Sequence, residues 1–308
     1  MGQGLEGRGD ENFDGRYGVK IARVFPRRTK ATPTDELAYT DVPDMFVPKV
    51  DAVHVSVSFS WDLPRAEWLA RQWEHIAPVS IGGPATGMRG GDFEPGMYLK
   101  RGYVITSRGC PNRCWFCSVW KREGQGVREL PITDGWNVLD DNLLACSDTH
   151  IKAVFAMLKR QKERPEFTGG LEAARLQDWH IDLLADLKPK QIFFAYDTPD
   201  DFEPLVCAVR KLRDAGIGEK SKQVRVYVLI GYPKDTIESA RRRLDSVLMI
   251  GAWPMAMLWR DEKNGSQSIE WRRIQREYSR PAIMHARAED VVTKIAEGGA
   301  GLDFPSEM

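Results

Sequence analysis

Hydrophobic and polar residues alternate in short segments near the start of the chain. Residues 19–25 and 51–59 alternate in this way and are rich in β-branched side chains, which predicts two strands. A helix with an apolar face opens at Asp62, a candidate N-cap residue. Residues 79–84 form a third short strand that ends in glycines. This part of the chain therefore predicts a small β–β–α–β unit.

From about residue 102 the pattern changes to apolar runs separated by amphipathic segments. The runs predict six strands, at residues 103–107, 137–142, 166–173, 191–197, 223–233 and 254–260. The segments between the later runs predict helices, at residues 148–161, 177–187, 203–215 and 236–250. A strand that recurs every 25 to 35 residues with a helix between is typical of parallel βα units. Six units are too few for a closed eightfold barrel, so we expect an α/β fold with a partial (β/α)6 barrel.

These patterns divide the chain into four parts. Residues 1–17 are polar and glycine-rich and lack an apolar segment, which predicts a disordered leader rather than a secretory signal. We expect a small α/β cap over residues 18–95 and the barrel over residues 96–262. Residues 263–308 are then a C-terminal helical extension with a helix at 286–297. Because the chain has no apolar run of about 18 residues, we expect no membrane span.

The net charge and the cysteine count exclude some classes of function. Lys and Arg number 44 and Asp and Glu number 44, so bulk positive charge does not hold this chain on nucleic acid, although a local basic patch can. The five cysteines are odd in number, and three of them lie within eight residues. A secreted disulfide framework has an even, spread set. We therefore expect the reducing cytoplasm, with metal or redox chemistry at the clustered thiols.

The clustered thiols are Cys110, Cys114 and Cys117, on the loop after the first barrel strand. A structural zinc site needs four ligands, and only one C-x-x-C pair is present. A redox pair of Cys114 and Cys117 leaves Cys110 without a role. The remaining interpretation is a [4Fe–4S] cluster with three protein ligands and one open iron. Of the two isolated cysteines, Cys146 and Cys207, we expect the second to face the core.

The spacing C-x-x-x-C-x-F-C, with Phe116 in the aromatic position, resembles the radical S-adenosylmethionine (SAM) enzymes over roughly residues 100–260. The resemblance implies that SAM binds the open iron of the [4Fe–4S] cluster beside Phe116. One electron from a flavodoxin- or ferredoxin-like reductant then cleaves SAM, and the resulting 5′-deoxyadenosyl radical abstracts hydrogen from a C–H bond. A second functional class, a non-catalytic iron–sulfur electron carrier, stays open, although such proteins usually ligate every iron.

The resemblance also implies that groups at the strand ends bind SAM. Asp140 and Asp141 end the second barrel strand, and either can accept a hydrogen bond from the methionine ammonium. The family's Gly-Gly-Glu stretch has a counterpart here with one residue inserted, in which Gly169 and Gly170 precede Glu172. We expect the glycines to let the backbone approach the ligand. The inserted residue leaves open whether Glu172 or the Asp pair meets the ammonium. We assign catalytic roles to Asp141 and Glu172, with a turn or helix cap as the alternative for each aspartate.

Later strand ends supply the other SAM contacts that the resemblance implies. Arg175 can pair with the methionine carboxylate, because a guanidinium matches a carboxylate in shape and charge, with a solvated arginine at the start of a helix as the alternative. Asp197 can hold the ribose hydroxyls or the substrate, and otherwise caps the next helix. Ile230 and Gly231 are candidates to contact the adenine, with ordinary core and turn residues as the alternative.

The part before the barrel resembles a truncated cobalamin-binding domain. It lacks the D-x-H-x-x-G motif that supplies the histidine for cobalt, so we expect a degenerate cap without cobalamin.

The substrate is not encoded in the cysteine motif. Residues 270–281 interleave aromatic residues with arginines, and Arg272 and Arg276 lie on one helical face. This face is either solvated or binds an anion. We therefore expect a nucleotide or a modified nucleic-acid base as substrate, with a free amino acid or small metabolite as the alternative.

Overall fold

The computed structural model describes residues 18–218, 222–260 and 268–280, together with residues 282, 284, 286 and 287. The leader predicted at residues 1–17 lies outside this part, as does most of the helix predicted at 286–297. The chain divides into two compact units, Met1–Met88 and Arg89–Met308.

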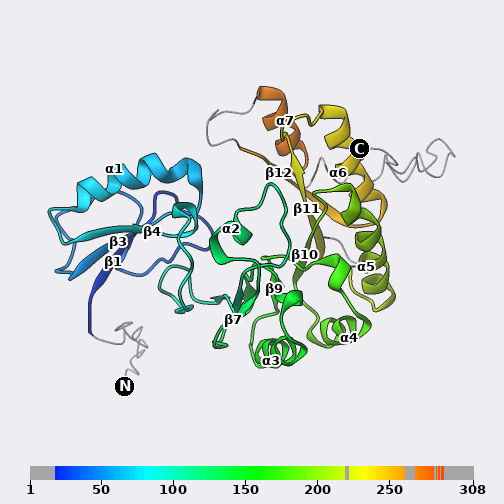
Figure 1. Ribbon diagram of the computed structural model, residues 1–308, viewed down its shortest axis with the longest axis horizontal. Coiled ribbons are helices and arrows are strands. Elements are labelled where there is room, and N and C mark those ends of the chain that lie inside the picture. Colours follow the sequence, from blue (N-terminus) through cyan, green and yellow to red (C-terminus); the bar gives the residue numbers. More distant parts are fainter. Residues whose placement is uncertain are drawn as a thin grey trace, which may run out of the picture. The chain divides into compact units, whose positions relative to one another are not determined.

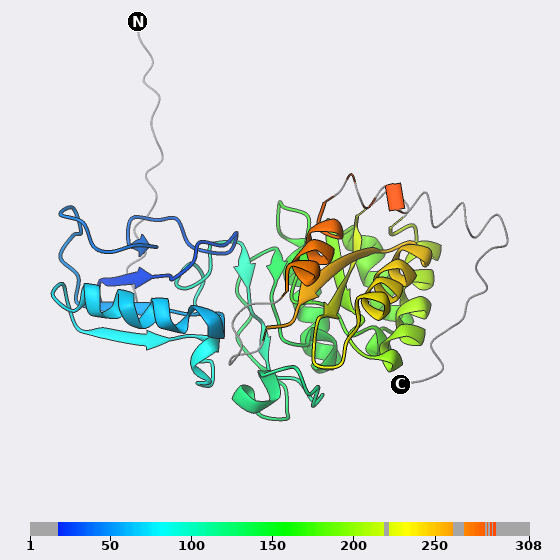
Figure 2. The same cartoon turned by 90° about the horizontal axis from the view of Figure 1, so that it is seen from above.

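The first unit contains a four-stranded parallel sheet in the order β2-β1-β3-β4. Its elements are β1 (Ile21–Val24), β2 (Ala38–Tyr39), β3 (Ala52–Ser56), η1 (Ser60–Asp62), α1 (Leu63–Trp73), β4 (Val79–Gly82) and η2 (Pro84–Thr86). The helix α1 runs along one face of the sheet (Figure 2). Val53 and Val55 are fully buried, as is Trp73 of α1. The predicted β–β–α–β order is confirmed, and β2 is an additional strand at the sheet edge.

Asp62 begins α1 without capping it. Its side chain makes no N-cap hydrogen bond, and instead accepts two hydrogen bonds from Arg27, both 2.8 Å long. Pro64 in the first turn carries no N–H, so one of the donors that a cap would satisfy is absent.

The second unit contains a six-stranded parallel sheet whose spatial order follows the chain, β5-β8-β9-β10-β11-β12. The strands are β5 (Tyr103–Val104), β8 (Asn137–Val138), β9 (Glu166–Phe167), β10 (Gln191–Ala195), β11 (Val224–Ile230) and β12 (Trp253–Leu258). The helices between and after them are η3 (Leu143–Ala145), α3 (Asp148–Lys159), η4 (Ala173–Arg175), α4 (Asp178–Leu187), η5 (Pro199–Asp201), α5 (Phe202–Asp214), α6 (Ile237–Met249) and α7 (Ile269–Glu277). The α/β class with parallel strands is confirmed.

The core of this unit lies between the sheet and its helices, with α3, α4, α5 and α6 along one face (Figure 1). Every second residue of β11 is buried, so one side of this strand faces the core. Leu205 of α5 and Leu244 of α6 are fully buried in the same cluster. The prediction for Cys207 is wrong, because this residue is exposed on α5.

The first predicted barrel strand is shorter than expected and splits into two pieces. After β5 the chain leaves the large sheet and forms β6 (Ser107–Arg108), which pairs antiparallel with β7 (Arg128–Glu129). The segment that carries Cys110, Cys114 and Cys117, called the cysteine segment below, lies between these two strands in the sequence. So does α2 (Val119–Glu123). The small ribbon therefore brings together the two ends of the cysteine segment.

Gly169 is a packing requirement of this fold. A Cβ atom at this position would lie 2.5 Å from the Asp140 carbonyl oxygen and 2.8 Å from the Leu139 carbonyl carbon. We expect Gly169→Ala to lower the free energy of unfolding by about 1–3 kcal/mol, because backbone must shift to relieve the overlap. Urea unfolding measures this loss. Gly126→Ala is the control, since its Cβ would meet nothing within 4 Å, and equal effects for both variants would contradict the packing argument.

Candidate iron–sulfur and SAM site

The cysteine segment reaches the carboxyl ends of the parallel strands. Cys117 N donates to the Cys114 carbonyl over 3.1 Å, which closes a tight turn around Trp115 and Phe116. The Trp115 ring lies edge-on to the ring of Tyr232, with centroids 5.5 Å apart, and to that of Phe116 at 5.4 Å. Because Tyr232 follows β11, this contact fixes the segment at the end of the sheet where βα proteins bind ligands.

The three thiols lie within electrostatic reach of one another. Burial raises the pKa of the Cys114 thiol to about 11, with smaller contributions from Cys117 and Cys110. Burial, and to a lesser degree Cys110, also raises the pKa of Cys117. Nevertheless, among the described residues no three Cys, His, Asp or Glu side chains form a group that could hold a metal ion.

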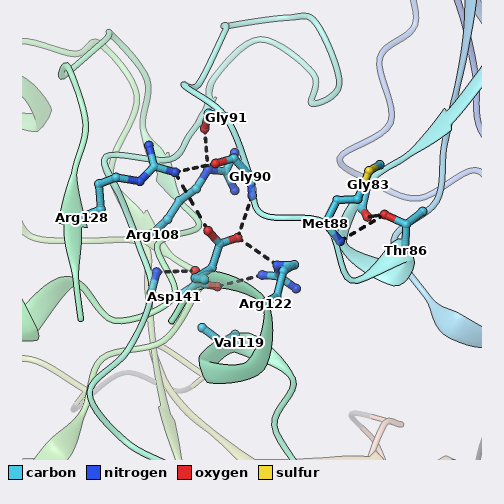
Figure 3. Close-up of polar contacts among 12 residues, drawn as sticks. Gly83, Thr86, Met88, Gly90, Gly91, Arg108, Val119, Arg122, Arg128 and Asp141 are labelled. Atoms are coloured by element: carbon cyan, nitrogen blue, oxygen red, sulfur yellow. Dashed lines mark hydrogen bonds and ion pairs between the residues drawn. The ribbon is translucent and has the colours of Figure 1, made fainter. Parts of the chain in front are cut away.

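Asp141 holds both ends of the cysteine segment. Its Oδ2 accepts a hydrogen bond from Gly109 N over 2.8 Å, and its Oδ1 lies 3.7 Å from Arg122 Nη2 (Figure 3). Gly109 precedes the first cysteine, and Arg122 lies in α2 just after the third. Burial raises the pKa of Asp141, although the Gly109 N–H and Arg122 oppose this shift.

Glu123 extends this network toward residues 90 and 91. Its buried Oε1 accepts from Arg122 Nε over 2.9 Å and from Gly90 N over 3.1 Å. Arg108 Nε donates to the Gly91 carbonyl over 2.9 Å (Figure 3). These contacts fix α2 and therefore the end of the cysteine segment. Sequence reasoning missed them, because charged residues give no signal of their distant partners.

Asp140 is enclosed by protein donors. It is 2% exposed, and its carboxylate accepts from Thr106 N and Thr106 Oγ1 over 2.6 Å each, and from Ser107 Oγ over 2.7 Å. Burial raises its pKa, against the opposing effect of these hydrogen bonds. Asp140 therefore joins the end of β8 to the connection between β5 and β6, and its oxygens are already occupied.

Glu172, Arg175 and Cys110 are brought together by a residue that the sequence did not single out. Asn142 Nδ2 donates to Glu172 Oε2 over 2.6 Å and to Cys110 Sγ over 3.3 Å. Arg175 Nε donates to the same Glu172 oxygen over 2.6 Å. Asn142 is 4% exposed, and its Oδ1 is buried without a hydrogen-bond partner among the described residues.

Asp197 follows β10 at the same end of the sheet. Its Oδ1 accepts from Leu229 N over 2.8 Å, which joins the ends of β10 and β11. Burial raises its pKa to about 7, with a smaller contribution from Asp201, while Leu229 N–H and Arg243 oppose the shift. A carboxyl group perturbed in this way at a strand end is a common feature of functional sites.

The raised pKa of Asp197 predicts a pH dependence of stability. The pKa of Asp197 in the folded chain, about 7, exceeds the ordinary value of 3.8. The stabilisation of the folded state by the protonated Asp197 is therefore fully present below about pH 3.8 and is lost as pH rises through about 7. We expect the neutral variant Asp197→Asn to gain stability relative to the parent as pH increases. Urea unfolding of both chains at about pH 5 and pH 8 measures this difference. A difference that is the same at both pH values would contradict the assignment.

The glycines and Ile230 serve packing first. Ile230 is fully buried in the core. Gly231 has a φ of 73°, and a Cβ there would lie 3.1 Å from the Trp271 ring. Gly170 has a φ of 93°, which favours glycine, and a Cβ there would meet only Phe193 O at 3.8 Å. Gly231 therefore lets α7 approach the end of β11.

Arg272 and Arg276 lie on the exposed side of α7, whose Ile274 is buried. Arg276 Nε donates to the Arg272 carbonyl over 3.2 Å. No described hydrogen bond or ion pair joins either arginine to the cysteine segment.

In the part that the structure describes, no helix is both long enough and apolar enough to cross a bilayer. A scan against models of known protein families finds no match, and a search of curated proteins finds no significantly similar relative.

Proposed function

We propose that this chain is a radical SAM enzyme, with a partial (β/α)6 barrel and a [4Fe–4S] cluster bound by Cys110, Cys114 and Cys117. The observation that carries this proposal is the position of the cysteine segment at the strand ends, where Asn142 connects Cys110 to Glu172. Barrel enzymes place their chemistry at this edge of the sheet.

The donor set fits the cluster. Thiolates are the usual ligands of iron–sulfur clusters, and three of them leave one iron open for SAM. The three sulfur atoms lie on one short segment fixed at both ends by Asp141. In this proposal the three thiols converge and lose their protons only when the cluster assembles. The unpartnered Oδ1 of Asn142 is a buried acceptor that a bound donor can satisfy.

The residues around the segment bind and orient SAM in this proposal. When bound, the cluster supplies one electron that divides SAM into methionine and a 5′-deoxyadenosyl radical, which takes a hydrogen atom from substrate carbon. Glu172 accepts from the methionine ammonium through Oε1, which makes no hydrogen bond within the described residues. Arg175 binds the methionine carboxylate through its terminal nitrogens, since only its Nε is engaged by Glu172.

Asp197 accepts from the ribose hydroxyls, and Gly231 lines the adenine beside Tyr232. Asp141 keeps the cysteine segment in place. The electron comes from a flavodoxin- or ferredoxin-like protein, and the thiols stay reduced in the cytoplasm.

A nucleotide or nucleic-acid base is the substrate class we propose. Trp271 of α7 packs against Gly231, and Tyr232 next to it contacts Trp115 of the cysteine segment. This chain of contacts brings one end of α7 to the site, so Arg272 and Arg276 can supply donors for phosphate oxygens.

Deuterium transfer tests both the reaction and the substrate class. The reduced, cluster-loaded chain is incubated with SAM and deuterated nucleotides, oligonucleotides or amino acids. Deuterium in 5′-deoxyadenosine identifies the compound that loses hydrogen. Transfer from an amino acid alone would replace the nucleotide assignment, and absence of transfer from every class would oppose it.

A further inference from the structure

The amide of Asn142 contacts two groups that act in different parts of the proposed reaction. Its Nδ2 lies 3.3 Å from the sulfur of Cys110 and 2.6 Å from Glu172 Oε2. An amide nitrogen carries two hydrogens, so both hydrogen bonds form at once. The reversed orientation of the amide would place its oxygen against the carboxylate, so the contacts define which atom is nitrogen.

A hydrogen bond to a cluster sulfur changes the cluster's reduction potential. Reduction adds negative charge, and an N–H donor stabilises this charge more strongly in the reduced state than in the oxidised state. Asn142 is 4% exposed, so water does not compete freely for its amide, and burial strengthens the hydrogen bonds that the amide donates.

We propose that Asn142 is a positioning residue that couples SAM occupancy at Glu172 to the ease of reducing the cluster at Cys110. This inference rests on the proposed function. In the SAM-free state the negatively charged Glu172 accepts a strong hydrogen bond from one N–H of the amide. This hydrogen bond makes the other N–H a weaker donor to sulfur. When the methionine ammonium neutralises Glu172, the N–H that faces Cys110 becomes a stronger donor. The electron therefore enters more readily when SAM is in place.

Two variants separate this role from simple packing. Asn142→Leu keeps the approximate size of the side chain and removes both N–H groups. Asn142→Asp keeps its shape and adds negative charge near Cys110 and Glu172. The matched control is Asn137→Leu, because Asn137 lies in β8 five residues before Asn142, is 6% exposed, and accepts a hydrogen bond from Thr168 instead of donating one to sulfur.

The measurement is an anaerobic redox titration of the full chain, monitored by the electron paramagnetic resonance signal of the reduced cluster, with and without SAM. We expect Asn142→Leu to lower the equilibrium constant for reduction by up to about tenfold, which is about 59 mV for one electron. Asn142→Asp lowers it further. In both variants SAM raises the potential less than it does in the parent, whereas Asn137→Leu behaves as the parent does.

Three outcomes would overturn the inference. If all variants load iron and sulfide and titrate at the parent potential, Asn142 does not tune the cluster, and the proposed function stands. If both Asn142 variants lose the cluster while Asn137→Leu keeps it, the role of Asn142 is structural. If the parent itself binds no iron and sulfide, the proposed function fails and the inference fails with it.

Discussion

Replacing Cys110, Cys114 or Cys117 with alanine is expected to abolish cluster loading. The parent should take up about four irons and four sulfides per chain after anaerobic reconstitution. Two thiolates do not hold a cluster whose fourth iron is already without a protein ligand, so each substitution removes nearly all of the iron. Iron and acid-labile sulfide analysis, together with the visible absorption of the cluster, measures the loss.

Cys146→Ala and Cys207→Ala are the controls for this series. Burial raises the pKa of the Cys146 thiol to about 11, so it matches Cys114 in environment but not in position. Cys207 is exposed on α5. Both variants should load iron as the parent does. Tetrahedral zinc without sulfide in the reconstituted parent would contradict the cluster assignment.

Glu172→Gln is expected to weaken SAM binding by about ten- to a hundredfold. The carboxylate forms a charge-assisted hydrogen bond with the methionine ammonium in our proposal, and such a bond is worth roughly 1.5–3 kcal/mol. Glutamine keeps the side-chain length and an oxygen that can accept from Asn142, so the variant removes charge more than packing. Equilibrium binding of SAM to the cluster-loaded chain measures the change.

Glu166→Gln is the matched control for Glu172. Both residues belong to the strand predicted at residues 166–173, but Glu166 begins β9 and pairs with Lys190 at 2.7 Å, at the other end of the sheet. We expect its SAM affinity to equal that of the parent. Equal affinities for Glu172→Gln and the parent would show that another group meets the ammonium.

The periodicity of the sequence was sufficient to predict the βα order but not the strand lengths. The predicted strand 166–173 pairs only over Glu166–Phe167. The apolar signal continues because Leu171 is buried, at 3% exposure, in an irregular segment that bonds to the Phe193 carbonyl. Burial and strand pairing produce the same pattern of residues, so the sequence alone cannot separate them.

Some features of the candidate site depend on residues close together in the sequence, and others depend on residues that only the fold brings together. Cysteine spacing is local and therefore visible in the sequence. Asn142 lies 32 residues from Cys110 and 30 from Glu172, so only the fold shows that it joins them.

Asp140 and Asp141 are adjacent and of the same residue type, so the sequence alone did not predict which groups each of them contacts. In the structure Asp140 bonds to Thr106 and Ser107, whereas Asp141, at a bend after β8, bonds to Gly109 at the start of the cysteine segment.

The products formed from SAM test the central claim most directly. The reconstituted full chain is reduced anaerobically and incubated with SAM, and methionine and 5′-deoxyadenosine are quantified against a Cys114→Ala control. Our account predicts both products in equal amounts from the parent and neither above background from the control. Intact SAM in the presence of a fully loaded, reduced cluster would contradict it and favour an electron carrier.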